Sequence, residues 1–150
     1  MSLQWKHVRY FKQYEFDDPK YPGSGQYING ILLICLDKLR HDTGWAIMPN
    51  WKVGGCVDMK GDHGHSKDSY HLYSKGCKAT DFYFADPVSY KPINVPIIEQ
   101  FSKLIQSGLF DGVGVYPDWL TPGFHVDVGR VEPLYWVRKN DKYYYFRSPL

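Results

Sequence analysis

The C-terminal third of the chain limits the fold more than any other part. It contains four short segments rich in β-branched and aromatic residues, at 112–116, 124–128, 134–138 and 143–147. Segments of this length and composition are typical of strands, and the "KNDK" between the last two is typical of a hairpin turn. Because a hairpin pairs its strands antiparallel, these segments predict a small, mostly antiparallel sheet.

Two helical segments lie upstream of these strands. In residues 29–42 apolar side chains recur at steps of three and four, the spacing of one buried helical face, and Gly44 provides a stop. The second helix is expected to be capped by Asn94, to have Pro96 in its first turn and to end at Gly108. The pattern predicts an α+β fold with two main helices packed on the sheet. Two further strands are expected at 45–49 and 79–86.

Size and composition exclude several classes of protein. A chain of 150 residues fits one domain, 1–150, and can bury a core without disulfides. The formal net charge is only +2 and no Lys/Arg run is present, which argues against binding to nucleic acid. No apolar run approaches the ~20 residues of a membrane helix, and the N-terminus has no signal-peptide core. Three cysteines without a CxxC pair argue against a zinc ribbon or a disulfide framework.

A first pair of His and Asp lies in and just before the predicted strand at 79–86. His71 lies toward the end of a long polar loop over residues 52–78, and Asp81 lies on the strand that follows. In an extended strand Asp81 points away from the face that carries Phe82 and Phe84. A carboxylate there is costly to bury unless it is paired or binds a cation. A salt bridge or an exposed edge position is the alternative interpretation.

The second pair, His125 and Asp127, shares one face of the strand in "FHVDV". It can line a cleft and supply a ligand together with a base or an outer-shell partner. An exposed polar strand face is the alternative. A catalytic zinc site needs three protein ligands and one open position, so the two pairs together favour a metal site.

These stretches resemble the zinc D-Ala-D-Ala carboxypeptidase superfamily, which includes vancomycin-resistance dipeptidases, hedgehog-type domains and many phage endolysins. "SYHLYSKGCKATDF" is similar to its S-x-H…G…A-x-D signature. "GVGVYPDWLTPGFHVDVGR" is similar to the G-[IV]-G-x-Y…F-x-H-x-D-x-[GR] segment of the phage and cell-wall branch, and Trp136 matches the Trp that often follows. "YFKQYEFDDP" and the helix ending in Leu-Arg resemble the opening of that branch, so the similarity covers about residues 10–137.

The resemblance implies a hedgehog/D-Ala-D-Ala-peptidase-like fold and a zinc peptidase that cleaves peptidoglycan stem peptides or cross-links, as a carboxypeptidase or an endopeptidase. His71, Asp81 and His125 are then the Zn²⁺ ligands, and the metal activates a water molecule. The partner is a peptidoglycan peptide, and a monomer is expected. The protein is expected in the cytoplasm of its producer, or released by a phage lysis system or in a virion. The expected substrate-binding residues are Ser69, His65 and Tyr116.

Three departures from the family pattern affect the expected chemistry. Pro122 stands where several branches have their acid, so Asp127 is the expected catalytic carboxylate, although an outer-shell or ligand role stays open. The interval from His71 to Asp81 is about three residues longer than in H-x-x-G-x-A-x-D. Lys52 replaces the Arg of the S-G-Y-R turn as the expected electrophile, with a solvated loop lysine as the alternative.

Two further histidines of the loop, His63 and His65, allow several roles. One interpretation is that they donate hydrogen bonds near the zinc, and another is that they are simply exposed loop residues. A third is that they form an alternative set of metal ligands together with His71. The departures also allow a second function, that of a non-catalytic or weakened relative that binds a cell-wall fragment or a protein partner.

Overall fold

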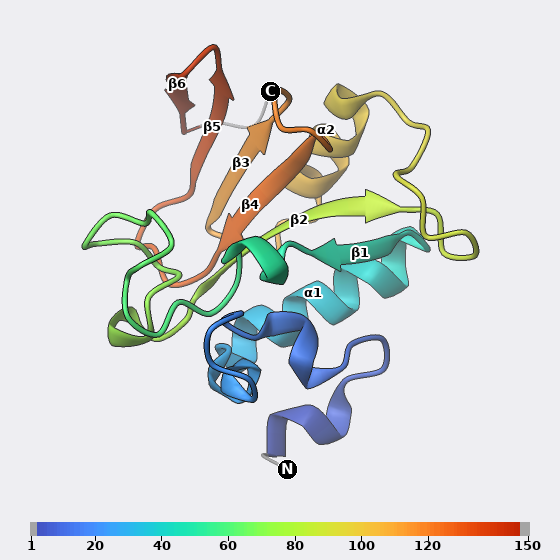
Figure 1. The fold of residues 1–150 in the computed structure, drawn as a ribbon. Helices are drawn as coiled ribbons and strands as arrows, with labels where there is room; N and C mark the ends of the chain where they lie inside the picture. Colours follow the sequence, from blue (N-terminus) through green and yellow to red (C-terminus); the bar gives the residue numbers. More distant parts are fainter. Residues whose placement is uncertain (1–2, 148–150) are drawn as a thin grey trace.

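The computed structural model describes residues 3–147 and has a six-stranded sheet at its centre (Figure 1). The strand order is β1-β2-β4-β3-β5-β6, and all neighbours pair antiparallel except β3 and β5, which are parallel. The predicted α+β fold with a mostly antiparallel sheet and two helices is therefore confirmed. The strands are β1 (Ala46–Pro49), β2 (Ala79–Ala85), β3 (Gly112–Tyr116), β4 (Gly123–Asp127), β5 (Leu134–Lys139) and β6 (Lys142–Phe146).

The two α-helices are α1 (Gly30–Thr43) and α2 (Ile97–Gln106). The side chain of Asn29 caps α1 by accepting hydrogen bonds from the first turn, and Gly44 ends the helix with a φ of 70°. The start of α2 differs from the prediction. Pro96 occupies the cap position instead of the first turn, and Asn94 makes no cap, because the helix begins only at Ile97.

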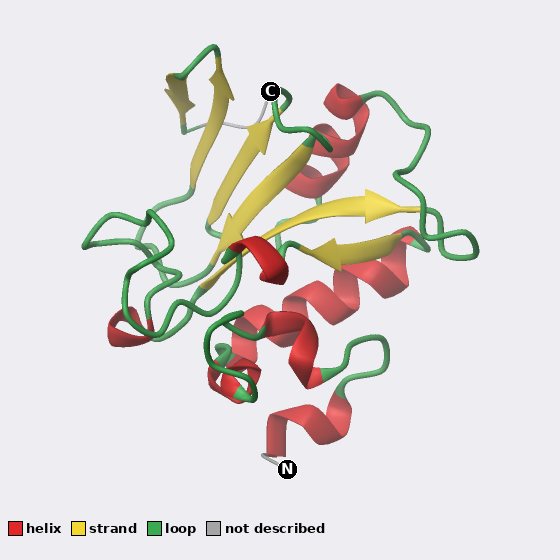
Figure 2. Cartoon of the chain, in the orientation of Figure 1, coloured by secondary structure: helices red, strands yellow, loops and turns green. Residues whose placement is uncertain are grey.

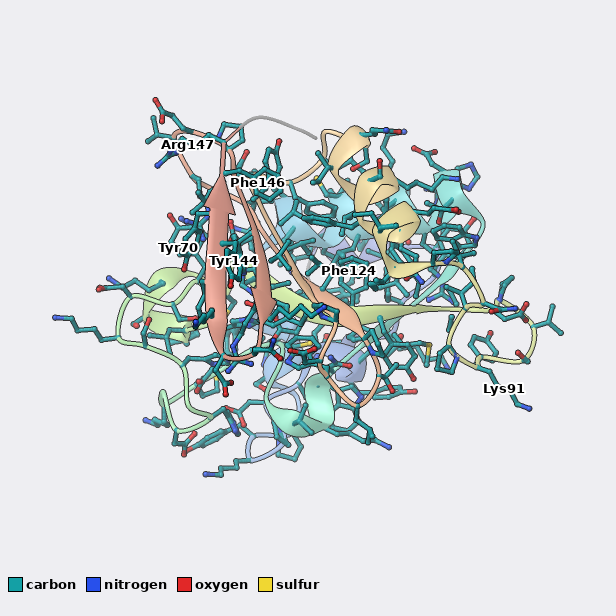
Figure 3. The ribbon with its side chains drawn as sticks, turned by 90° about the horizontal axis from the view of Figure 1, so that it is seen from above. Tyr70, Lys91, Phe124, Tyr144, Phe146 and Arg147 are labelled. Carbon is teal, nitrogen blue, oxygen red and sulfur yellow. The ribbon has the colours of Figure 1, made fainter. Side chains whose placement is uncertain are left out.

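The hydrophobic core lies between the helices and one face of the sheet. Phe82 and Phe84 of β2 contact Phe124 of β4, with ring centroids 5.7 and 5.5 Å from that of Phe124. Phe101 of α2 stacks on Phe124 from the helix side, and Figure 3 shows Phe124 inside the molecule beside this helix. Buried leucines of α1 belong to the same core cluster. The phenylalanines of β2 and β4 thus face the core, as predicted. The alternate residues of both strands point to the opposite face of the sheet.

Shorter segments cover the remaining core. Three 3-10 helices, η1 (Leu3–His7), η2 (Gln13–Phe16) and η3 (Ser24–Tyr27), lie in the part of the chain before α1. The long loop contains η4 (Trp51–Val53) and η5 (Tyr73–Lys75), and it lies at the end of the sheet where β2 begins and β4 ends (Figure 2). Within residues 3–147, no helix is long and apolar enough to cross a membrane. All three cysteines, Cys35, Cys56 and Cys77, are free thiols.

Candidate metal centre

Three side chains meet on the face of the sheet opposite the phenylalanines. His71 Nε2 lies 3.2 Å from His125 Nδ1 and 3.2 Å from Asp81 Oδ1, and His125 Nδ1 lies 3.0 Å from that same oxygen. Asp81 and His125 are direct cross-strand partners in the β2–β4 ladder, and the long loop brings His71 to them. Two nitrogens and one carboxylate oxygen at this separation can hold a metal ion. We call these three residues the triad.

The far nitrogen of His71 fixes its tautomer. His71 Nδ1 lies 3.0 Å from the backbone carbonyl oxygen of Cys56, and His71 is only 2% exposed. A carbonyl oxygen can only accept a hydrogen bond, so Nδ1 carries the proton. A metal ligand must be a neutral imidazole, and in that form of His71 the lone pair of Nε2 faces Asp81 and His125.

His125 is oriented in the same way by a buried ion pair. Its Nε2 donates to Asp127 Oδ2 at 2.8 Å, and Arg130 donates to both oxygens of that carboxylate at 2.8 and 2.7 Å. Burial alone would lower the pKa of His125, but the hydrogen bonds to Asp127 and Asp81 outweigh it and raise the pKa to about 9. The site therefore favours positive charge at this position, and a metal ion that binds there displaces the proton.

Asp81 remains an anion in spite of its surroundings. Burial alone would raise its pKa, but the charge of His71 and the hydrogen bonds from His125 and His71 hold the pKa well below its usual range. One ionised carboxylate and two imidazoles make a ligand set with a single negatively charged member. His₂-carboxylate sets of this kind are known for zinc.

Glycines of β3 make room for this arrangement. A Cβ atom on Gly114, which pairs with His125, would lie 2.2 Å from Trp136 Nε1. A Cβ on Gly112 would lie 2.3 Å from Asp127 Oδ1. The "GVG" of the sequence is thus needed because the indole and the carboxylate behind His125 lie directly against the backbone of β3.

His65 lies beside the triad but takes no part in the three close contacts among the triad residues. Its ring is parallel to that of His71, with centroids 4.2 Å apart, and its Nδ1 lies 2.8 Å from Asp58 Oδ2. Burial lowers the pKa of His65, and the nearby His71 lowers it further, against the hydrogen bond to Asp58. A ligand atom of His65 is within 4.8 Å of those of His71 and Asp81, so these three are an alternative set of metal ligands.

His63 belongs to a different cluster. Its Nε2 contacts Asp18 Oδ1 at 2.8 Å, and the side chain of Asp18 is wholly buried. His63, Asp18, Asp58 and Asp62 each offer a ligand atom within 4.8 Å of the others, so this group could also hold a metal ion. The sequence-based set of His63, His65 and His71 is therefore divided between two neighbouring clusters.

The triad opens into a cavity of about 760 Å³, which is large enough for a peptide segment. The expected substrate-binding residues Ser69, His65 and Tyr116 all line it. Ser69 Oγ also accepts a hydrogen bond from the backbone N–H of His71 at 3.3 Å, so it helps to hold the loop. The aromatic wall consists of Tyr70, Tyr116, Trp119, Trp136 and Tyr143.

Two predicted catalytic residues have positions that do not suit their expected roles. Asp127 belongs to the lining of the triad cavity, but it lies behind His125, its side chain is wholly buried, and His125 and Arg130 engage both of its oxygens. Its position is the outer-shell one. Lys52 is exposed on η4, its Nζ lies 5.7 Å from the centroid of the Trp51 ring, and it is not among the residues that line the triad cavity.

Sequence reasoning missed Arg130 and Asp58 as parts of the site. Arg130 follows Asp127 by three residues within the "HVDVGR" motif, so the motif itself was the available signal. Asp58 lies in the long loop with no periodic pattern, and only the folded path of that loop brings it to His65.

Comparisons of the chain with protein-family models, with curated proteins and with solved structures gave no match. The geometry of the triad and of its cavity therefore supports a candidate metal centre.

Proposed function

We propose that the protein is a zinc-dependent peptidase that cleaves peptidoglycan stem peptides or cross-links. One observation carries the proposal: both triad imidazoles have their far nitrogens hydrogen-bonded, to the Cys56 carbonyl and to Asp127, so that their near nitrogens face Asp81. Ligand atoms of a tetrahedral zinc site lie about 3.3 Å apart, given zinc–ligand distances of about 2.0–2.1 Å. The triad separations of 3.0–3.2 Å fit this ion.

The substrate class and the fold type rest on the motif resemblance. We propose a hedgehog/D-Ala-D-Ala-peptidase-like fold of the phage and cell-wall branch. The order of His71, Asp81 and His125 along the chain, their meeting on one sheet face and the two helices behind the sheet support this assignment.

The residues around the triad divide the chemistry of peptide hydrolysis among them. A zinc ion held by the triad would supply an activated water molecule and polarise the scissile carbonyl. His65 accepts the proton of the attacking water and gives it to the amine that leaves, because Asp58 holds its Nδ1 and its lowered pKa keeps it neutral near pH 7. Asp127 and Arg130 orient His125 and take no part in bond making. This assignment gives the base role to His65 in place of Asp127.

The test combines wall hydrolysis with metal content. Zinc-loaded protein is expected to release amines from purified cell walls, and EDTA should abolish the release. His65→Gln should keep one bound zinc per chain but lose about 10²–10⁴-fold in rate, the usual contribution of a general base. His7→Gln, in the 3-10 helix at the N-terminal end, is the matched control and should retain full rate. If His65→Gln loses its zinc, His65 is a ligand and the base assignment is wrong.

Asp127 gives an independent prediction about metal affinity. Asp127→Asn keeps the shape of the side chain but weakens its hold on the His125 N–H and on Arg130. We expect zinc affinity to fall about 10–100-fold, as for other outer-shell partners of metal-bound histidines. Competition with a chromophoric chelator measures this, and Asp141→Asn, at an exposed turn position, is the control. Unchanged affinity in Asp127→Asn would show that Asp127 does not orient His125.

A further inference from the structure

Arg138 and Tyr116 lie on the same sheet face as the triad. Arg138 is two residues beyond Trp136 on β5, and the ring of Trp136 lies 5.2 Å from that of His125. On β3, Gly114 pairs with both His125 and Trp136, and Tyr116 lies two residues beyond Gly114. Because alternate strand residues share a face, both side chains belong to the wall next to the triad, and both line its cavity.

Arg138 has hydrogen-bonding capacity that the protein does not use. Its Nε is buried and has no hydrogen-bond partner among residues 3–147. Its Nη2 donates to Asp141 Oδ1 at 2.8 Å, but the Asp141 side chain is 90% exposed. An exposed pair of this kind is weak, so it competes poorly with a ligand carboxylate. The guanidinium also lies over the ring of Tyr143, which limits its orientation.

Tyr116 adds a second unused donor. Its hydroxyl oxygen accepts a hydrogen bond from Trp136 Nε1 at 2.9 Å, so its own proton is available to a further acceptor. Burial raises the pKa of Tyr116, so the hydroxyl keeps this proton at neutral pH. The ring is fixed by stacking on Trp119, with centroids 4.3 Å apart.

We propose that Arg138 and Tyr116 form a carboxylate-binding subsite beside the triad. A carboxylate is the ligand that matches a fork of guanidinium N–H donors together with a hydroxyl donor. The inference rests on the proposed function and deepens it, because it requires a substrate with a free carboxylate close to the scissile bond. That group is either the C-terminal carboxylate of a stem peptide or a side-chain carboxylate within it.

The experiment measures binding of acetyl-Lys-D-Ala-D-Ala and of its C-terminal amide to the full chain by isothermal titration, with zinc and after EDTA treatment. The free acid is expected to bind at least about tenfold more tightly than the amide, the effect of charge-assisted hydrogen bonds. Arg138→Gln should reduce this ratio to near one, and Tyr116→Phe should reduce it partly. Arg147→Gln is the control, since Arg147 is exposed at the end of β6 and pairs with Glu132 (Figure 3).

Equal binding of acid and amide to the wild type, or an unchanged ratio in Arg138→Gln, would overturn the subsite. Arg138→Lys keeps the charge and should keep part of the ratio, which separates lost recognition from lost folding. A third peptide, amidated at its C-terminus but with a free D-Glu side chain, identifies the source: the carboxylate that gives the tighter binding is the one recognised. Zinc content is measured on the same samples. If the acid binds more tightly than the amide but the protein takes up no zinc, the peptidase proposal is refuted and the subsite stands. If cell walls are cleaved but acid and amide bind equally, only the subsite is refuted.

Discussion

His71→Ala is expected to remove both zinc-dependent hydrolysis and the stabilisation that zinc gives to the fold. At a thousandfold excess over its Kd, zinc should add about 4 kcal/mol to the free energy of unfolding. For a chain of this size that corresponds to an increase in Tm on the order of 10 °C. His71→Ala removes one of three ligands whose donor atoms lie only 3.0–3.2 Å apart, so this increase should vanish. Thermal unfolding with and without zinc measures it.

The control for this prediction uses the neighbouring cluster. His63 and Asp18, with Asp58 and Asp62, form a separate group that could also hold a metal ion. His63→Ala changes a partly buried histidine of the same loop and should keep the zinc-induced increase in Tm. The opposite pattern, loss in His63→Ala and retention in His71→Ala, would move the metal to that cluster. The readout is the zinc-induced change, so the separate cost of each substitution to the metal-free fold does not enter.

Phe124→Ala is expected to produce the largest loss of stability. Phe124 is wholly buried and contacts the rings of Phe82, Phe84 and Phe101. Truncating a buried phenylalanine costs about 3–5 kcal/mol, because apolar contacts are lost and a cavity remains. Urea unfolding should show a lower midpoint at nearly the same slope. Zinc affinity should also fall, since His125 is the next residue on β4.

Leu120→Ala is the matched control, because Leu120 is fully exposed and lies in the connection between β3 and β4. It should change the free energy of unfolding by less than about 0.5 kcal/mol. A loss below about 1 kcal/mol in Phe124→Ala would mean that the core does not depend on this ring and that the packing described for β2, β4 and α2 is wrong.

Local patterns predicted the parts of the fold that have a period or a clear stop. The helix that ends before Gly44 and the strands of the last third follow from spacing, and the last hairpin has Asn140 and Asp141 at positive φ, as its turn sequence predicts. The two strand faces were also predictable, because alternation alone separates Asp81 and His125 from the phenylalanines. These patterns are local, so a single sequence contains them.

Contacts made by irregular segments could not be predicted in the same way. The long loop brings Asp58 to His65 and the Cys56 carbonyl to His71, and neither contact has a spacing rule. The catalytic role predicted for Lys52 rested on comparison with the Arg of the S-G-Y-R turn. In the structure Lys52 is exposed and does not line the triad cavity. The role of Asp127 was open because His125 and Asp127 share a strand face whether the carboxylate supports the histidine or faces a substrate.

The triad and the catalytic proposal are separable. If zinc binds as described and no wall peptide is cleaved, the protein is the non-catalytic relative that the Pro122 departure allows, and its cavity serves to bind a ligand. If hydrolysis occurs and Asp127→Asn retains part of it while His65→Gln does not, the base assignment to His65 stands.

The most direct test of the central claim is a crystal structure of zinc-soaked protein with data collected at the zinc absorption edge. One anomalous peak is expected at about 2.0–2.2 Å from His71 Nε2, His125 Nδ1 and an oxygen of Asp81. A peak instead among Asp18, Asp58, Asp62 and His63, or no peak at the triad under saturating zinc, would contradict the account.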